Sequence, residues 1–139
     1  MVDSLLTQAI SLADNLNFAF NTTSGIPHND LAYQNKSGLD TENNIAQIGT
    51  LVLEWTRLSD LSGNRIYANL TQRAEEYLLN TSPSSAEPFP GLITTRYDLE
   101  TGQGIGTSGG WGALSDSYYE YLLKMYIYDQ VKYAHYGEA

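Results

Sequence analysis

The residues best suited to chemistry lie between positions 115 and 120, in the run Ser-Asp-Ser-Tyr-Tyr-Glu. Ser117 and Glu120 have the spacing of a capping box, in which the hydroxyl accepts a helix amide and the carboxylate reaches back. Asp116 then stands beside the helix start, where the positive end of the helix dipole favours a negative charge. An aspartate held ionised can serve as a general base or bind sugar hydroxyls. The alternative is that Asp116 only caps the helix.

The helix that follows is predicted to run to about residue 134 and is strongly apolar. Asp116, Glu120 and Lys124 recur every four residues and form the polar stripe on it, so they share one face. The remaining positions are mostly aliphatic or aromatic, and we expect the helix to be packed on most sides.

Other motifs carry less chemistry. Gly104-Ile-Gly-Thr-Ser-Gly109 matches G-x-G-x-x-G, but a dinucleotide site needs a buried strand before the glycines and a helix directly after them. Those glycines fit the return strand of a hairpin better. The segment 98–102 lacks the acidic spacing of a calcium loop. His28 and His135 have no partner at ligand spacing, and we expect them on the surface.

Composition excludes several function classes. The 139 residues carry a formal net charge of −9 with seven basic residues, and these are scattered, so no nucleic-acid partner is expected. The absence of cysteine excludes disulfides and thiolate metal sites within this sequence. Eleven tyrosines suit either helix packing or a carbohydrate cleft, and packing is the simpler interpretation. No apolar run approaches the ~20 residues of a membrane span.

Hydrophobic periodicity predicts helices over residues 4–20, 45–60 and 65–79, besides the one after residue 116. Residues 21–44 read as one long loop, and a short β-hairpin is expected at 92–107. The class is therefore mainly α. On the second helix, four polar residues share a face that we expect to line a cavity: Gln47, Thr50, Glu54 and Arg57. On the third helix, Ile66 is expected to face inward and Glu75 outward.

Four N-x-S/T sequons, at Asn21, Asn35, Asn69 and Asn80, favour passage through the secretory pathway. The first six residues, however, lack the basic and apolar regions of a signal peptide. Two alternatives follow: a cytosolic protein, or a piece of a secreted protein whose export signal lies upstream of this sequence. The sequons favour the second.

Three stretches resemble family 47 glycoside hydrolases, the class I α-1,2-mannosidases. They are residues 45–63 (IAQIGTLVLEWTRLSDLSG), Gly91-Leu-Ile and residues 116–124 (DSYYEYLLK). Their order and spacing match too, and the similarity is greatest to secreted fungal members. The resemblance covers nearly the whole sequence.

The resemblance implies an (α/α)7 barrel closed by a β-hairpin, of which residues 1–139 would be a partial piece. It also implies removal of α-1,2-linked mannose from high-mannose N-glycans, with inversion and with Ca²⁺. The aspartate of D-S-Y-Y-E-Y, here Asp116, is one of the family's acidic residues at the scissile bond. Inversion needs a second carboxyl group roughly 6.5–9.5 Å away. In the family that group, and the threonine that helps to hold Ca²⁺, come from segments with no counterpart here.

The resemblance also assigns substrate contacts to Gln47, Leu114 and Glu120. Gln47 takes the position of a frequent glutamate that lines the sugar site, and an amide can hydrogen-bond a hydroxyl but cannot act as a base. Leu114 stands where some relatives carry an arginine that contacts the glycan. A leucine at this position resembles the Golgi and fungal members, which trim mannose more broadly. The alternative function is a non-catalytic glycan-binding or helical interaction protein on the same scaffold.

Overall fold

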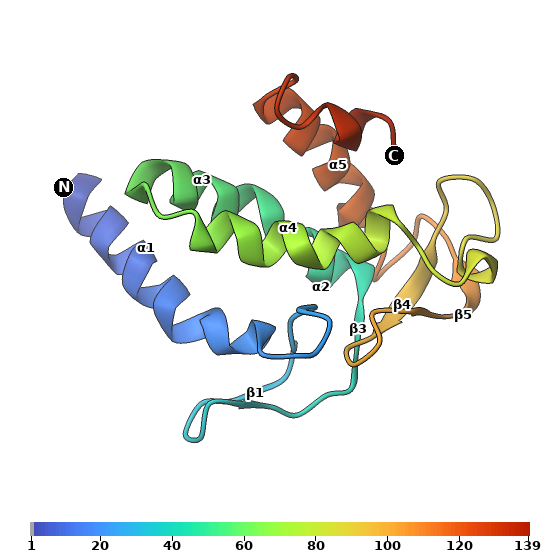
Figure 1. Cartoon of the computed structure of the whole chain (residues 1–139), viewed down its shortest axis with the longest axis horizontal. Coiled ribbons are helices and arrows are strands. Elements are labelled where there is room, and N and C mark those ends of the chain that lie inside the picture. The colour runs from blue at the N-terminus through green and yellow to red at the C-terminus, as the bar shows by residue number, and fades with distance from the viewer. Residues whose placement is uncertain (1) are drawn as a thin grey trace.

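A computed structural model describes residues 2–139 and confirms a mainly helical chain with a small sheet (Figure 1). Short 3₁₀ helices lie between larger elements at Asn17–Phe20 and Ser84–Ala86, and a third follows the last α-helix at Ala134–Gly137. The α-helices are α1 Val2–Leu16, α2 Ile45–Gly49, α3 Val52–Ser62, α4 Ile66–Leu79 and α5 Asp116–Tyr128. The strands are β1 Leu31–Ala32, β2 Ser37–Gly38, β3 Glu42–Asn44, β4 Thr94–Asp98 and β5 Gly104–Gly109.

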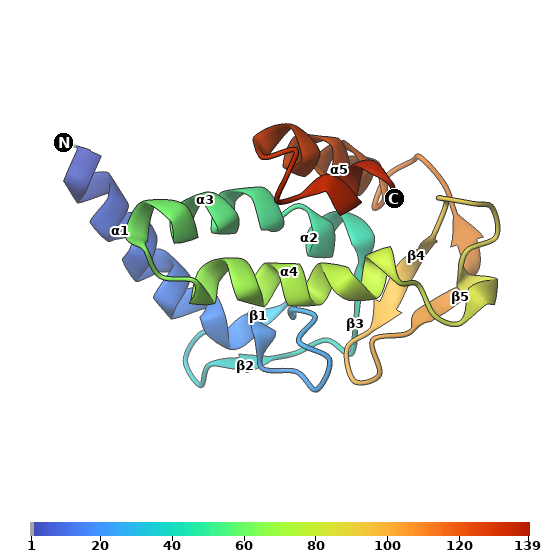
Figure 2. The same cartoon turned by 45° about the horizontal axis from the view of Figure 1, so that its top comes forward.

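Helices α3 and α4 form an antiparallel pair, and they lie side by side in both views (Figures 1 and 2). The turn between them uses Gly63 in the left-handed conformation, with φ of 74°, which a residue without Cβ adopts at no steric cost. The Gly63 amide donates to the Ser59 carbonyl at 2.9 Å. The Ser59 hydroxyl donates to the Asn64 carbonyl at 2.7 Å, which fixes the reversal.

The predicted hairpin is confirmed as β4 and β5, and β3 adds a third antiparallel strand beside β4. Gly104–Gly109 is therefore the return strand rather than a nucleotide loop. At Gly109 a Cβ atom would lie 2.4 Å from the Ile93 carbonyl oxygen, so the close strand approach requires glycine there.

The expectation of one long loop over residues 21–44 was wrong. This segment contains β3 and the small antiparallel pair β1–β2. Strand β3 is Glu-Asn-Asn, with no apolar alternation to reveal it. Its pairing with β4 holds it instead, with Asn43 opposite Tyr97.

Two predicted helices are shorter than expected. Residues 45–60 form two helices, because the chain leaves α-helical geometry at Thr50, whose hydroxyl donates to the Ala46 carbonyl at 2.6 Å. The last helix ends at Tyr128 instead of about 134. There the Asp129 carboxylate accepts the amides of Val131 and Lys132, at 3.0 and 2.9 Å, and closes a turn.

The core lies where α2, α4 and α5 meet the sheet. Five tyrosines are buried, which confirms packing as their main use: Tyr67, Tyr97, Tyr118, Tyr133 and Tyr136. The expectation that the last helix is packed on most sides was wrong, because Leu123 and Ile127 of α5 are exposed. Ile66, predicted to face inward on α4, is exposed too. Within the described residues no helix is long and apolar enough to cross a membrane.

Candidate active site

Asp116 is the first residue of α5, and its side chain is exposed. Leu114 adopts a positive φ of 75°, and this bend lets the Gly112 carbonyl accept the Ser115 and Asp116 amides at 3.1 and 3.0 Å. The Asp116 Oδ1 atom accepts the Ser117 amide at 3.0 Å. One carboxylate oxygen is thus held by the helix end, while the side chain remains open to solvent.

The predicted capping box between Ser117 and Glu120 was wrong. The N-cap is Ser115, without a side-chain capping bond, because the Gly112 turn starts the helix two residues earlier than the motif requires. Glu120 instead pairs with Lys124, with 3.3 Å between its Oε2 and the lysine Nζ. Asp116, Glu120 and Lys124 are all exposed, as expected for a polar face of α5.

Gln47 lies on the first turn of α2. Asn44 caps that helix by accepting the Gln47 amide at 3.0 Å, and the Asn44 side-chain amide donates to Gln47 Oε1. Gln47, Glu54 and Arg57 are exposed. The expectation that their stripe lines a cavity is met in part. Glu54 and Arg57 line a hollow of about 540 Å³ together with residues of α1, whereas the break at Thr50 separates Gln47 from this face of α3.

The structure brings Gln47, Leu114 and Asp116 to neighbouring positions. The Ala46 amide donates to the Leu114 carbonyl at 3.0 Å, which ties the start of α2 to the loop that precedes Asp116. One turn further, a Cβ at Gly49 would lie 2.4 Å from the ring of Tyr118, so α2 and α5 are in close contact. The three residues therefore surround one junction between two helix starts.

Trp111 lies in the loop before Asp116 and was not singled out from the sequence. Its side chain is 67% exposed, and its ring centroid is 4.4 Å from that of Tyr119. Tyr119 in turn accepts the Ile93 amide at its hydroxyl, at 3.2 Å. The signal that could have identified Trp111 is its position among Gly109, Gly110 and Gly112, a glycine-rich loop directly before the aspartate.

Glu75, predicted to face outward from α4, is fully buried. Its Oε2 accepts the Tyr136 hydroxyl, whereas Oε1 has no hydrogen-bond partner. Burial raises the pKa of Glu75 to about 8, and the Tyr136 hydrogen bond opposes that rise. The prediction that Glu75 faces outward was wrong because of the helical register. Glu75 lies next to the buried Ala74 and three positions before the buried Leu78, so it lies at the edge of the apolar stripe.

No calcium cage is formed by the described residues, among which no three histidine or acidic side chains gather. Ca²⁺ prefers six to eight oxygen ligands. In the acidic turn after β4, the Asp98 Oδ1 atom already accepts the Glu100 amide and both the amide and the hydroxyl of Thr101. The Asp98 carboxylate therefore stabilises the turn in which it lies. The residues present do not form a calcium site by themselves.

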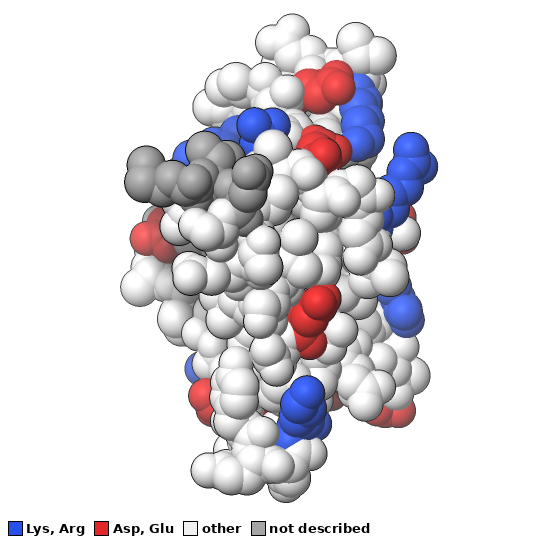
Figure 3. Space-filling model, turned by 90° about the vertical axis from the view of Figure 1, so that its left-hand side faces the viewer, with Lys and Arg blue, Asp and Glu red and all other residues white. Residues whose placement is uncertain are grey.

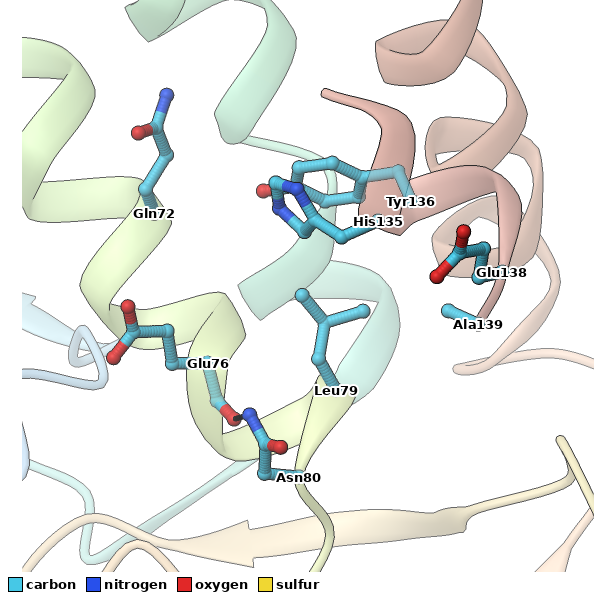
Figure 4. A pocket seen from close by; sticks show the side chains of 8 residues that line it. All are labelled: Gln72, Glu76, Leu79, Asn80, His135, Tyr136, Glu138 and Ala139. Carbon is cyan, nitrogen blue, oxygen red and sulfur yellow. Dashed lines mark hydrogen bonds between the residues drawn. The ribbon is translucent and has the colours of Figure 1, made fainter. Parts of the chain in front are cut away.

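A cavity of about 450 Å³ lies away from Asp116, between α4 and the C-terminal 3₁₀ helix (Figure 4). It is lined by Gln72, Glu76, Leu79, Asn80, His135, Tyr136, Glu138 and Ala139. None of the predicted site residues lines it. On the face seen in Figure 3, most of the surface is uncharged, and acidic and basic side chains are interspersed, which is unlike a phosphate-binding patch.

Comparisons with known proteins place these residues in a family. The model of glycosyl hydrolase family 47 matches residues 1–139. The mannosyl-oligosaccharide alpha-1,2-mannosidase of Coccidioides posadasii is 53% identical over 138 residues, which are 99% of this chain and 27% of that protein. The probable mannosyl-oligosaccharide alpha-1,2-mannosidase 1B of Aspergillus clavatus is also 53% identical, over 139 residues and with the same shares.

A solved structure agrees with the sequence comparisons. The alpha-1,2-mannosidase from Trichoderma reesei superposes with a TM-score of 0.92 at 50% sequence identity, and covers 99% of this chain and 28% of its own. The chain thus spans about 27% of the length of the curated relatives it matches. The resemblance drawn from residues 45–63, 91–93 and 116–124 is confirmed: the chain belongs to glycosyl hydrolase family 47.

Proposed function

We propose that this chain forms part of an α-1,2-mannosidase that removes terminal α-1,2-linked mannose from high-mannose N-glycans with inversion. In this proposal residues 1–139 contribute a sector of an (α/α)7 barrel. The relatives named above support the activity, and the observation that carries it is the exposed Asp116 at the start of α5, beside Gln47 and Leu114.

Asp116 is proposed as one of the two carboxyl groups of the inverting reaction. Inversion requires one group that protonates the departing oxygen and another that activates a water on the opposite face of the sugar. The Ser117 amide holds Asp116 Oδ1, so Oδ2 is the oxygen that can exchange a proton with the substrate or water. The second carboxyl group comes from a family segment outside residues 1–139.

The substrate contacts are assigned to the residues around the same junction. Gln47 and Glu120 offer hydrogen-bonding groups on α2 and α5, and Leu114 offers an apolar side chain that is 45% exposed. Trp111, supported by Tyr119, adds an aromatic face to the loop before Asp116. Sugar rings present apolar C–H faces as well as hydroxyls, so this mixture of groups fits a mannose residue.

Calcium dependence and passage through the secretory pathway complete the proposal. Since the described residues form no cage for a calcium ion, no step of the reaction is assigned to one. The secretory route is supported by the four sequon asparagines, all of which are exposed: Asn21, Asn35, Asn69 and Asn80.

A hybrid enzyme tests the role of Asp116. Residues 1–139 would replace the matching segment of the Trichoderma reesei mannosidase, which the TM-score of 0.92 permits. In the hybrid, Asp116→Asn should lower kcat for mannose release from an α-1,2-mannobioside by about 100-fold or more. Glu100→Gln, which neutralises an exposed carboxylate on the hairpin turn, should leave kcat unchanged. A near-normal kcat in Asp116→Asn would reduce Asp116 to a helix-terminal residue.

The isolated chain of residues 1–139 should show no turnover, because inversion needs both carboxyl groups. The measurement is mannose release from a high-mannose glycan, with and without added Ca²⁺. Detectable release would contradict the proposal that the second carboxyl group lies elsewhere. If the hybrid bound mannose disaccharides in calorimetry but hydrolysed none, the glycan-binding alternative would replace the enzyme.

A further inference from the structure

The four sequons differ in the geometry that surrounds each asparagine. N-linked glycosylation requires the asparagine amide and the hydroxyl two residues later to be presented together in an accessible segment. In a helix, residues two positions apart point to opposite sides. In a turn, they can lie side by side. The four sites can therefore be ranked by the local structure that their sequences prefer.

Asn35 has the arrangement that the modification needs. It lies in the exposed turn between β1 and β2, where Leu31 pairs with Gly38. The Ser37 hydroxyl of the same sequon donates to Asn35 Oδ1 at 2.9 Å. The turn lies at the lower edge of the molecule in Figure 1, away from α3, α4 and α5. The amide and hydroxyl thus already meet, with open space around them.

The base of this turn is held in place by Asp40. Its Oδ1 lies 2.6 Å from His28 Nδ1, and its Oδ2 accepts the Asn29 amide at 2.8 Å and the Asp30 amide at 3.2 Å. The Leu39 amide donates to the Asp30 carbonyl at 2.9 Å. These bonds involve residues on both sides of the pair β1–β2, so the turn that carries Asn35 is a defined structure.

Asn69 and Asn80 lack this arrangement. Asn69 lies within α4, and the hydroxyl of its sequon, on Thr71, is fully buried and donates to the Ala68 carbonyl at 3.2 Å. The Asn80 Nδ2 atom, which would form the bond to sugar, donates to the Glu76 carbonyl at 3.0 Å. Asn21, at the end of the first 3₁₀ helix, is exposed but lacks a hydrogen bond to its Thr23 hydroxyl among the contacts described.

We propose that Asn35 is the N-glycosylation site of this chain, with Ser37 as the sequon hydroxyl. In the transfer, Asn35 Nδ2 forms a bond to the anomeric carbon of a lipid-linked diphosphate oligosaccharide. The bond from that carbon to the diphosphate oxygen breaks, the diphosphate leaves with the electron pair, and one amide proton is released. The glycan would stand beside Tyr33 and Leu39, which are 51% and 69% exposed, and would shield these apolar side chains from other molecules.

This inference rests on the proposed passage through the secretory pathway, and the experiment separates the two. The chain would be translated with an added leader peptide in the presence of endoplasmic-reticulum microsomes, and protease-protected material would be analysed. A variant that fails to fold is still scored, since the readout is one glycan-sized step in gel mobility. Occupied sites are identified by mass spectrometry after enzymatic release of the glycan in heavy-oxygen water.

We expect Asn35→Gln and Ser37→Ala to lose one glycan step, Ser37→Thr to keep it, and Asn69→Gln to leave the mobility of the chain unchanged. Loss of a step in Asn69→Gln but not in Asn35→Gln would overturn the inference. An unmodified chain inside the microsomes would also overturn it, while the mannosidase proposal would stand on the hybrid enzyme. Failure of the secretory proposal would give a different result: the protein in its own cells would be confined to the cytosol.

Discussion

Two carboxylates of this chain, Glu75 and Asp116, have opposite surroundings. Glu75 on α4 is fully buried, with one hydrogen bond from Tyr136 and a pKa raised to about 8 by burial. Asp116 at the start of α5 is exposed and accepts the Ser117 amide. Tyr118 on α5 is buried, and the charge of Glu75 helps burial to raise its pKa. One acid is enclosed by protein and the other is accessible to a substrate.

The contrast between Glu75 and Asp116 suggests that one carboxyl group contributes to stability and the other to the reaction. A buried carboxyl group with an unpaired oxygen stays protonated at neutral pH, since the charged form would lose its hydration without a compensating cation. It is then part of the packing between α4 and the C-terminal 3₁₀ helix. An exposed carboxylate at a helix start costs the fold little and can meet a sugar. Glu75 should therefore govern how stability depends on pH, and Asp116 should govern the reaction.

The largest expected effect on stability is its pH dependence. Glu75 has a higher pKa folded, about 8, than its ordinary value of 4.5. The folded state therefore binds the extra proton between these values, and unfolding releases it. Stability should be full below about pH 4.5 and should fall as the pH rises to about 8. The slope is about 1.4 kcal/mol per pH unit at most.

Urea unfolding of the chain at several pH values measures this slope. Glu75→Gln removes the titrating group and should flatten the profile over this range. Asp116→Asn is the matched control, because it neutralises the exposed acid and should leave the slope as in the unmodified chain. An equal loss of slope in both variants would contradict the contrast between the two carboxylates.

Removal of the Tyr136 hydroxyl should have the next largest effect. Tyr136→Phe deletes the donor to Glu75 Oε2. Because Oε1 has no partner either, neither carboxyl oxygen would then have a hydrogen bond, at a cost of about 1–3 kcal/mol in the free energy of unfolding. That hydrogen bond lowers the pKa of Glu75. Its loss should therefore raise this pKa further and extend the falling part of the stability profile to higher pH.

The control for this prediction is Tyr126→Phe, which deletes a hydroxyl from a half-buried tyrosine on the same helix as Tyr118. It should leave the pH profile unchanged. If Tyr136→Phe lost stability equally at all pH values, the hydroxyl would act through packing alone and not through Glu75.

The sequence predicted the parts of this comparison that depend on local pattern. The helix that follows residue 116 and the hairpin each have a local signal. The environments of Glu75 and β3 depend instead on segments far away in the chain. Glu75 is covered by Tyr136, which lies 61 positions later, and β3 is a strand only because β4 pairs with it. No window of neighbouring residues contains that information.

In the candidate site, too, some features follow from local sequence and others depend on distant segments. Asp116 is predicted from its helix start and the family resemblance, whereas its position beside Gln47 depends on the hydrogen bond between Ala46 and Leu114. Trp111 was missed because an isolated tryptophan has no periodicity to mark it. Its contact with Tyr119 appears only when the loop folds back on α5.

Glu120 offers the smallest effect on stability and completes the comparison on the exposed face of α5. Its pair with Lys124 is solvent-exposed, with 3.3 Å between the charged atoms, and such pairs contribute about 0.5 kcal/mol or less. Glu120→Gln should therefore change the urea midpoint of the chain very little. In the hybrid enzyme the same variant should raise KM for the mannobioside more than it lowers kcat, because Glu120 is assigned to sugar binding. A large loss of stability with unchanged KM would instead make Glu120 a structural residue, and the functional surface of α5 would then be confined to Asp116.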